Sequence, residues 1–278
     1  MPWNLWTTRG RYPVRVGTSH AAAFFDLDKT ILATSSALAF TKPFYKGGLI
    51  RRSDVIRSAY AQFVFLASGA DHDQMEAMRQ YMSKLVTGWD VAKVREIVAE
   101  TLDEIIDPVV YEEAVALIES HQAAGRDVII ISSSGTEVVE PIGARLGVDL
   151  AVGTQLAVED GCYTGEIVFY AYGDGKAQAM RDLADERGYD LAESFAYTDS
   201  ITDLPMLEAV GYPTAVNPDS ALREIAEARE WPVQDFARPV AMKSRISNKQ
   251  AAAAAGASAA LGAVALGATW YARHRRTG

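Results

Sequence analysis

The sequence predicts an α/β protein in which a doubly wound parallel sheet forms the core and a helical domain is inserted after the first strand. Apolar runs that end in polar residues, such as AAAFFDLD at 21–28, are typical of strands buried in a parallel sheet. Such runs alternate with helical patterns in the second half of the chain, as in other doubly wound proteins. Residues 35–107 show helical patterns only and therefore indicate an insertion.

The N-terminal part of the chain leads through the first strand into the insertion. The first 20 residues include three arginines and two prolines but no continuous apolar stretch, so we expect an irregular arm without a secretory signal. Successive helices are expected in the insertion. Their predicted N-caps are Ser53 and Asp71, and their predicted C-terminal ends are Gly69 and Gly88.

After Pro108, strands and helices are expected to alternate. Asp160 and Gly161 separate two runs of alternating polarity between 150 and 168, which predicts a β-hairpin. The other expected strands are 128–131, 194–199 and 213–217, and the expected helices are 111–125, 136–147, 175–188, 201–211 and 219–229.

This order of elements predicts a chain of several parts. They are an irregular arm at 1–20, a catalytic core at 21–34 and 108–240, a helical cap at 35–107 and a transmembrane helix at 251–272. The last segment has no charge across 22 positions and could cross a hydrocarbon core of about 30 Å. Because it is rich in Ala and Gly, a flexible tail or a soluble helix is the alternative. We expect a cytoplasmic catalytic domain that this helix anchors to the cell membrane.

Composition narrows the possible partners and metals. A formal net charge of -9 argues against nucleic-acid binding, because neutralising phosphates requires clustered Lys and Arg. Cys162 is the single cysteine, so neither an intrachain disulfide nor a thiolate zinc site is expected. The four histidines are too scattered to form ligand pairs. Any bound metal is therefore expected to be a hard cation on oxygen ligands.

The candidate site residues come directly after predicted strands. Asp26 and Asp28 follow the first strand, Ser132 follows the second, and Asp199 and Asp203 follow the strand at 194–199. In a doubly wound sheet these positions converge in one crevice beyond the carboxyl ends of the strands. Grouped carboxylates repel one another, so a compensating cation is expected there. Oxygen ligands of this kind suit Mg²⁺ together with a substrate phosphate.

Lys176, at the start of the helix expected at 175–188, is the candidate second positive charge. A divalent cation and a lysine are what a phosphoryl group requires while its charge redistributes. The residues alone therefore point to chemistry on a small phosphorylated substrate.

Four motifs in this order resemble those of the haloacid dehalogenase (HAD) superfamily, in its phosphoserine-phosphatase-like branch. They are DLDKT, IIISSS, GKAQAM and YTDSITDLPML, and the resemblance covers about residues 21–235. It implies a HAD-like Rossmannoid core with a helical cap and a Mg²⁺-dependent phosphomonoester hydrolase.

The resemblance also implies a role for each matching residue. Asp26 would be the nucleophile that forms an aspartyl-phosphate, and Asp28 would be the general acid and base. Ser132 would bind the phosphoryl oxygens, and Lys176 would hold the nucleophile and the phosphoryl group together. The implied metal ligands are Asp26, Asp28 through its main-chain carbonyl, Asp199 and, in an orienting or supplementary role, Asp203.

Two positions depart from the pattern of that branch. Ser35 stands where phosphoserine phosphatases have an acidic residue for the substrate's amino group, so phosphoserine is doubtful as the substrate. Ser133 and Ser134 stand where relatives tend to have two glycines. A small phosphorylated metabolite or a lipid-derived phosphate is expected instead. The alternatives are a phosphotransferase or phosphomutase of the same superfamily, or a catalytically idle, membrane-tethered phosphate-binding protein.

Overall fold

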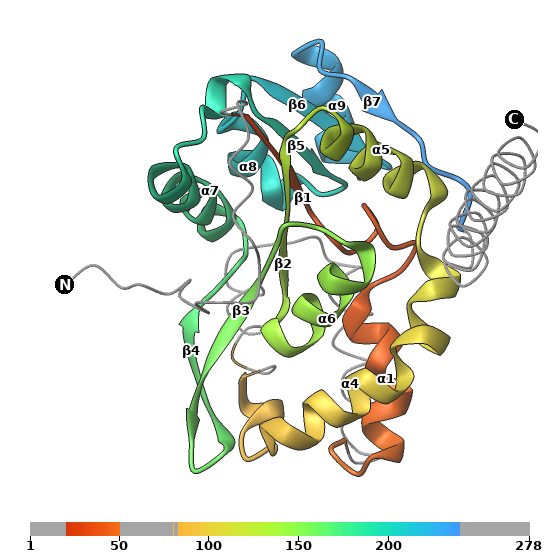
Figure 1. The fold of residues 1–278 in the computed structure, drawn as a ribbon, viewed down its shortest axis with the longest axis vertical. Coiled ribbons are helices and arrows are strands. Elements are labelled where there is room, and N and C mark those ends of the chain that lie inside the picture. The colour runs from red at the N-terminus through yellow and green to blue at the C-terminus, as the bar shows by residue number, and fades with distance from the viewer. Residues whose placement is uncertain (1–20, 51–79, 81–82, 240–278) are drawn as a thin grey trace, which may run out of the picture. The chain divides into compact units, whose positions relative to one another are not determined.

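A computed structural model describes residues 21–50, 80 and 83–239, which contain a seven-stranded sheet with helices on both faces (Figure 1). The strand order is β4-β3-β2-β1-β5-β6-β7, and neighbouring strands are parallel except β3 and β4. The strands are β1 (Ala22–Phe25), β2 (Asp127–Gly135), β3 (Leu150–Glu159), β4 (Cys162–Phe169), β5 (Phe195–Thr198), β6 (Tyr212–Val216) and β7 (Val233–Gln234). The predicted α/β class is confirmed.

The helices connect the strands and cover the sheet. The α-helices are α1 (Ser36–Lys46), α4 (Val91–Ile105), α5 (Glu112–Ala123), α6 (Thr136–Leu146), α7 (Asp174–Arg187), α8 (Leu204–Glu208) and α9 (Ser220–Ala228). Short 3-10 turns are η1 (Asp107–Val109), η2 (Leu191–Glu193) and η3 (Ile201–Asp203).

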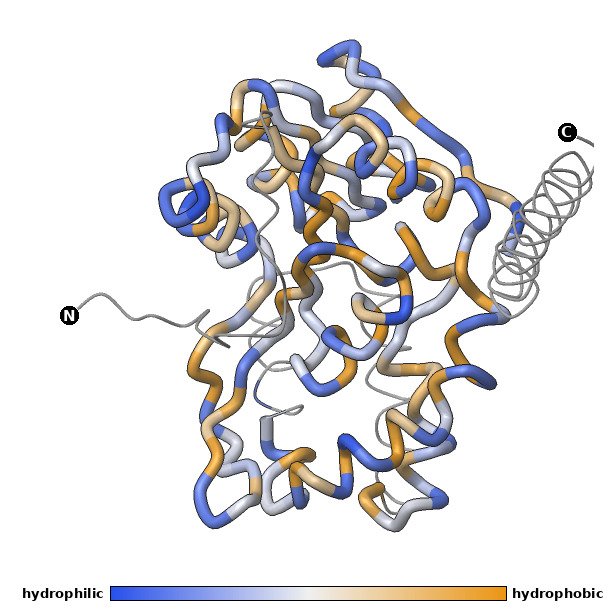
Figure 2. Tube along the Cα trace, in the orientation of Figure 1, coloured by the Kyte–Doolittle hydropathy of each residue, from blue (hydrophilic) through white to orange (hydrophobic). Residues whose placement is uncertain are grey.

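Alternation along β1 divides the core between the two faces of the sheet. Phe24 belongs to a buried cluster with Met180 of α7 and Leu207 of α8. Phe25 points to the other face, where its ring lies 6.0 Å from that of His121 on α5. Figure 2 shows hydrophobic residues along the central strands, as expected for a sheet that is covered on both sides.

The described part of the predicted cap is joined to the core by main-chain hydrogen bonds. The Val91 N–H, at the start of α4, donates to the Gly161 carbonyl over 3.0 Å, and the Tyr163 N–H donates to the Trp89 carbonyl over the same distance. Arg95 of α4 also bonds Glu137 of α6 at 3.2 Å. The β3–β4 hairpin and α6 therefore hold the N-terminal half of α4.

Most of the predicted elements are confirmed, and the differences have local causes. Asp160 and Gly161 form the turn of the β3–β4 hairpin with φ angles of 48° and 81°. The helix expected at 201–211 is instead the turn η3 followed by the short α8, because Pro205 has no N–H to donate and is tolerated only at a helix start. Strand β7 was not predicted, since two residues give no alternation to detect.

Several predictions fall outside the described residues. They are the arm at 1–20, the caps Ser53 and Asp71, the helix end Gly69 and the segment at 251–272. None of the helices in the described part of the chain combines the length and apolarity that crossing a bilayer requires.

Candidate active site

The register of the central strands brings the predicted site residues to one edge of the sheet. Phe25 of β1 pairs with Ile130 of β2 on one side and with Tyr197 of β5 on the other. Asp26 continues this pairing, because its N–H donates to the Tyr197 carbonyl over 2.9 Å. Ser132 and Asp199 lie one step further along the flanking strands.

Lys176 reaches the same edge from the first turn of α7. Its ammonium lies 2.5 Å from Asp26 Oδ1 and 2.7 Å from Asp203 Oδ2. All three side chains are almost completely buried, with exposed fractions of 3%, 8% and 4% for Lys176, Asp26 and Asp203. A glycine precedes the lysine because any side chain at Gly175 would collide with the Tyr170 carbonyl.

Asp203 is held from two directions. Its Oδ2 accepts the bond from Lys176 and another, of 2.7 Å, from the Thr198 hydroxyl at the end of β5. These contacts fix the carboxylate beside the lysine. They favour an orienting role for Asp203 over direct contact with a metal, because the bonded oxygen already accepts from two donors.

Burial and the grouping of carboxylates both shift the pKa values of the side chains at this edge. Burial raises the pKa of Asp26 to about 8, against the opposing effect of Lys176, and the charges of Asp203, Asp199 and Asp28 add to the rise. Burial also disfavours the charged form of Lys176, but the nearby carboxylates outweigh it and raise the pKa of that lysine. The lysine is therefore charged, and it balances only part of the cluster.

Asp199 has a solvent-exposed lysine as its partner. Among the described residues, the cation nearest to Asp199 is Lys29, whose Nζ lies 3.8 Å from Asp199 Oδ2 on a side chain that is 63% exposed. Burial raises the pKa of Asp199 to about 7, Lys29 opposes the rise, and Asp203 adds to it. A hard cation between Asp26 and Asp199 would relieve this imbalance, so the donor set fits Mg²⁺.

Asp28 turns toward the beginning of α1. Its Oδ1 accepts the Ser36 N–H over 2.9 Å, and its Oδ2 accepts the Ser35 hydroxyl over 3.3 Å. Burial raises the pKa of Asp28, and the hydrogen bonds from Ser36 and Ser35 oppose the rise. The carboxyl group is therefore tied to the predicted cap as well as to the core.

Ser132 is buried within the second half of β2, with an exposed fraction of 1%. Its hydroxyl oxygen accepts the Ser134 N–H over a long 3.3 Å. In turn, the Ser134 hydroxyl lies 2.7 Å from that of Ser36. All six predicted site residues are thus found at the carboxyl ends of β1, β2 and β5 or beside them.

Three residues with contacts at this edge were not among the predicted site residues: Thr198, Ser36 and Lys29. Lys29 lies inside the DLDKT motif and adopts a left-handed φ of 59°, and Thr198 lies inside the YTDSITDLPML motif, so a signal existed for both. Ser36 belongs to none of the four motifs. Its contacts with Asp28 and Ser134 come from the fold alone.

Within residues 21–50, 80 and 83–239, no three acidic, histidine or cysteine side chains form a preassembled metal cage. Mg²⁺ usually takes only one or two carboxylates and completes its shell with water and substrate phosphate. Asp26 and Asp199 are the side chains that could hold it here.

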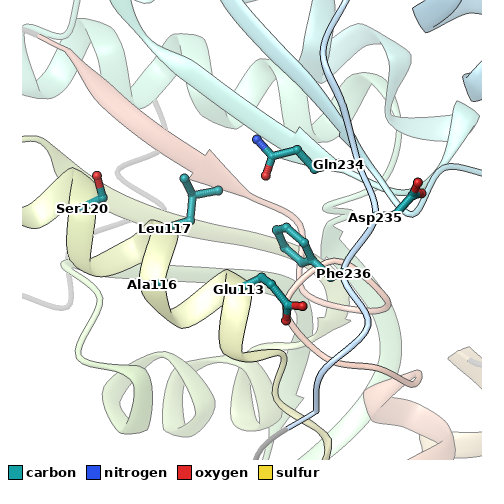
Figure 3. Close-up of a pocket in the computed structure, with 7 residues that line it drawn as sticks. All are labelled: Glu113, Ala116, Leu117, Ser120, Gln234, Asp235 and Phe236. Carbon is teal, nitrogen blue, oxygen red and sulfur yellow. The ribbon is translucent and has the colours of Figure 1, made fainter.

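A separate hollow lies between α5 and the chain that follows β7 (Figure 3). It has a volume of about 570 Å³, and Leu117 and Phe236 form part of its wall. Glu113 lies at its border and accepts the Ala237 N–H over 3.2 Å. None of the predicted site residues lines it, so we do not assign the carboxylate chemistry to this hollow.

Comparison with known proteins identifies the family. Residues 23–208 match the family model of haloacid dehalogenase-like hydrolases. The chain is 60% identical to the "Inhibition of morphological differentiation protein" of Streptomyces azureus, over 92% of this chain and 94% of that protein. It is 55% identical to a Mycobacterium tuberculosis protein named "Probable phosphatase", over 93% and 90% of the two chains. A phosphoserine phosphatase of M. tuberculosis is 36% identical, over 88% and 80%.

Solved structures show the same fold. A Bordetella pertussis protein of unknown function has a TM-score of 0.70 and 28% identity, covering 78% of this chain and 99% of its own. A phosphoserine phosphatase solved as a phospho-aspartyl intermediate analogue has a TM-score of 0.57 and 18% identity, covering 83% of this chain and 99% of its own. At that identity the second likeness concerns the fold alone.

Proposed function

The chain belongs to the haloacid dehalogenase-like hydrolase family as a phosphoserine-phosphatase-like phosphatase, and we propose that it hydrolyses phosphate monoesters through an aspartyl-phosphate on Asp26 with the help of Mg²⁺. The observation that carries this proposal is the buried Lys176 bridging Asp26 and Asp203 at the strand ends. One cation among these carboxylates leaves a place for a metal and for a phosphoryl group.

In the first step, a carboxylate oxygen of Asp26 attacks phosphorus, and the bond from phosphorus to the ester oxygen breaks. The protonated Asp28 gives its proton to the leaving oxygen, so that an alcohol departs. In the second step, a water attacks the aspartyl-phosphate and loses its proton to Asp28. Inorganic phosphate leaves, and the carboxylate of Asp26 is restored.

The remaining residues stabilise charge during these steps. Lys176 offers its ammonium to the phosphoryl oxygens without leaving Asp26, since the two are already 2.5 Å apart. Ser132 lies on β2, the strand beside β1, and offers a buried hydroxyl to the phosphoryl group. Asp203 positions Lys176 through the 2.7 Å contact between them.

We propose that Asp26, Asp199 and the main-chain carbonyl of Asp28 would hold Mg²⁺, with Asp203 in a supporting role. Bound there, the ion would neutralise negative charge on the phosphoryl oxygens during transfer. Burial, with a further contribution from the neighbouring carboxylates, raises the pKa values of Asp26 and Asp199, and the bound ion would oppose that rise by favouring their charged forms.

The proposed substrate is a small phosphorylated metabolite or a lipid-derived phosphate, chosen by a cap at 35–107 above a core at 21–34 and 108–240. The relative from M. tuberculosis with 36% identity makes phosphoserine a substrate to test. Against it, Ser35 offers a hydroxyl to Asp28 and supplies no carboxylate for an ammonium.

We further propose that the segment at 251–272 anchors the enzyme to the cell membrane, with its catalytic part in the cytoplasm. The charge-free sequence of this segment is the support for this proposal. Fractionation of the full-length protein and of a form truncated before Ala251 tests it. Recovery of the full-length form in the soluble fraction alone would remove the anchor.

The proposed hydrolysis is tested by the release of inorganic phosphate from 4-nitrophenyl phosphate, with and without Mg²⁺. We expect Mg²⁺-dependent turnover in the natural protein and a loss of roughly 10⁴-fold or more in Asp26→Asn, because the nucleophile is gone. Asp185→Asn makes the same chemical change at an exposed position of α7 and should leave turnover unchanged. Natural activity in Asp26→Asn would refute the assignment.

Two alternatives share this site and are separated by product analysis. A phosphotransferase or phosphomutase would pass the phosphoryl group from Asp26 to another hydroxyl, so an added alcohol would yield a new phosphate ester. A catalytically idle phosphate-binding protein would release no phosphate from any ester. The presence of Asp28 beside Asp26, Lys176 and Asp199 favours hydrolysis or transfer over simple binding, because binding requires no acid or base.

A further inference from the structure

A pair of hydroxyl groups joins the beginning of α1 to the end of strand β2. Ser36 is the first residue of α1 and is completely buried. Its hydroxyl lies 2.7 Å from that of Ser134. A buried hydroxyl without a partner would be costly, so each of these serines satisfies the other.

Each serine also contacts one of the proposed catalytic groups through its main chain. The Ser36 N–H donates to Asp28 Oδ1 over 2.9 Å, and the Ser134 N–H donates to Ser132 Oγ over 3.3 Å. These hydrogen bonds therefore form a continuous series from the proposed acid, Asp28, to the proposed phosphoryl-binding hydroxyl of Ser132. Neither Ser36 nor Ser134 itself has a place in the reaction proposed above.

We propose that Ser36 and Ser134 are positioning residues whose paired hydroxyls fix the first turn of α1, so that the Ser36 N–H aims the Asp28 carboxyl at the leaving oxygen. This inference rests on the proposed phosphatase chemistry and adds to it the residues that orient the acid. The anchored oxygen of Asp28 is Oδ1. The other oxygen, Oδ2, accepts the Ser35 hydroxyl over a longer 3.3 Å, and we assign the transferred proton to it.

Helix geometry allows the N–H of Ser36 to be removed while α1 is kept. Proline is favoured at the first position of a helix, where the N–H has no partner within the helix. Ser36 occupies this position, and Ser35 before it has φ −74° and ψ 131°, an extended conformation that proline accepts in its predecessor. Ser36→Pro therefore deletes both the N–H donor to Asp28 and the Ser36 hydroxyl, and the difference between Ser36→Pro and Ser36→Ala is due to the N–H.

Three further variants separate the main chain from the hydroxyls. Ser36→Ala keeps the N–H and removes the Ser36 hydroxyl, which pairs with Ser134 and also hydrogen-bonds Asp28. Ser134→Ala removes the other member of the pair and leaves both contacts between Ser36 and Asp28 in place. Ser133→Ala is the matched control, since it makes the same change at the exposed neighbouring serine of the same strand. Thermal unfolding of every variant checks that the fold is kept.

The readout is the dependence of kcat/KM on the leaving group. This ratio reports steps up to the release of the alcohol and is blind to the later hydrolysis of the aspartyl-phosphate. An alkyl phosphate such as glycerol 2-phosphate requires a proton from the acid. A 4-nitrophenyl ester releases a much more acidic phenol and requires the proton far less.

We expect Ser36→Pro to lower kcat/KM for the alkyl ester roughly 10-fold to 100-fold more than for the nitrophenyl ester, in the direction of Asp28→Asn. Ser36→Ala and Ser134→Ala should show the same selectivity at roughly 3-fold to 10-fold, and the double variant should lose little more than either single one, because the two hydroxyls act as a unit. Ser133→Ala should affect neither ester.

Equal losses on both esters in Ser36→Pro and in the two alanine variants would overturn the inference, because they would indicate a role in folding or substrate binding only. If Ser36→Pro does not fold, the alanine variants decide by the same criterion. Failure of the proposed function looks different, because the natural protein would then hydrolyse neither ester.

Discussion

Two of the places where the described part of the chain buries polar groups differ in how their charges are balanced. At the carboxyl edge of the sheet, Lys176 is in contact with Asp26 and Asp203 while Asp199 has only a distant lysine. On the α5 face of the sheet, His121 is equally buried but fully partnered. The Arg126 Nε donates to its Nδ1 over 2.7 Å, and its Nε2 lies 2.8 Å from the Tyr197 hydroxyl.

The two regions differ in how completely their buried polar and charged groups are compensated. Around His121 the hydrogen-bond pattern assigns one tautomer, with the proton on Nε2, and burial followed by the charge of Arg126 lowers its pKa to about 4. The ring is therefore neutral and every one of its polar atoms has a partner. At the carboxylate edge, burial raises the pKa of Asp26 and of Asp199. The negative charges of these carboxylates are therefore compensated only in part when no ligand is bound.

Asp199→Asn should give the largest loss of activity and, without Mg²⁺, a gain in stability. We expect activity to fall roughly 100-fold or more, because the amide is a weaker ligand for a hard cation. Without Mg²⁺ the variant should melt at a higher temperature than the natural protein, since one uncompensated charge is removed. Mg²⁺ should raise the melting temperature of the natural protein but hardly that of the variant.

Asp185→Asn on the exposed side of α7 is the control for this prediction. It should keep both the activity and the response of the melting temperature to Mg²⁺. An Asp199→Asn variant that Mg²⁺ stabilises as strongly as the natural protein would show that Asp199 does not hold the metal.

Lys176→Met should give the largest loss of stability. It leaves Asp26 and Asp203 buried without their shared cation, and breaking such a pair costs about 3 kcal/mol or more. Urea denaturation measures the change in the free energy of unfolding. Lys93→Met, which removes an exposed pair with Glu96, is the control and should change little. Unchanged stability in Lys176→Met would contradict the charge balance described here.

His121→Phe tests the neutral cluster through the pH dependence of stability. The folded pKa of His121, about 4, lies below its ordinary value of 6.5, so the unfolded chain takes up a proton first as the pH falls. Stability should therefore be lost from pH 6.5 down to about 4, by roughly 3 kcal/mol from this group. The phenylalanine variant should lose this component, and an unchanged slope would show that the histidine is not its source.

Tyr197→Phe should give the smallest effect of the four. The substitution leaves the ring stacked on Phe25, at 4.5 Å between centroids, and removes only the acceptor for His121 Nε2. We expect a loss of about 1 to 2 kcal/mol in the free energy of unfolding, with phosphatase activity kept. A loss of activity similar to that of Asp199→Asn would mean that the two regions are not independent.

Much of the fold followed from the sequence, because its signals are local. Apolar runs, glycines and prolines predicted the central strands, the hairpin at Asp160 and Gly161 and most helices after Pro108. The two-residue strand β7 left no periodic signal. The predicted site residues were recognisable as a set because polar residues follow several predicted strands, whose carboxyl ends meet in one crevice of a doubly wound sheet, and because four motifs occur in the order found in the HAD superfamily.

The sequence by itself determined the order of the elements and the chemical types that meet at the carboxyl edge. Only the tertiary structure decided which atoms became partners. Lys176 and Asp26 are separated by 150 positions, and Ser36 and Ser134 by 98, yet the first pair forms an ion pair and the second a hydrogen bond. The physical reason is that a hydrogen bond requires its donor and acceptor to be placed to within a few tenths of an ångström. Strand register and helix packing set that placement, and no local sequence pattern encodes it.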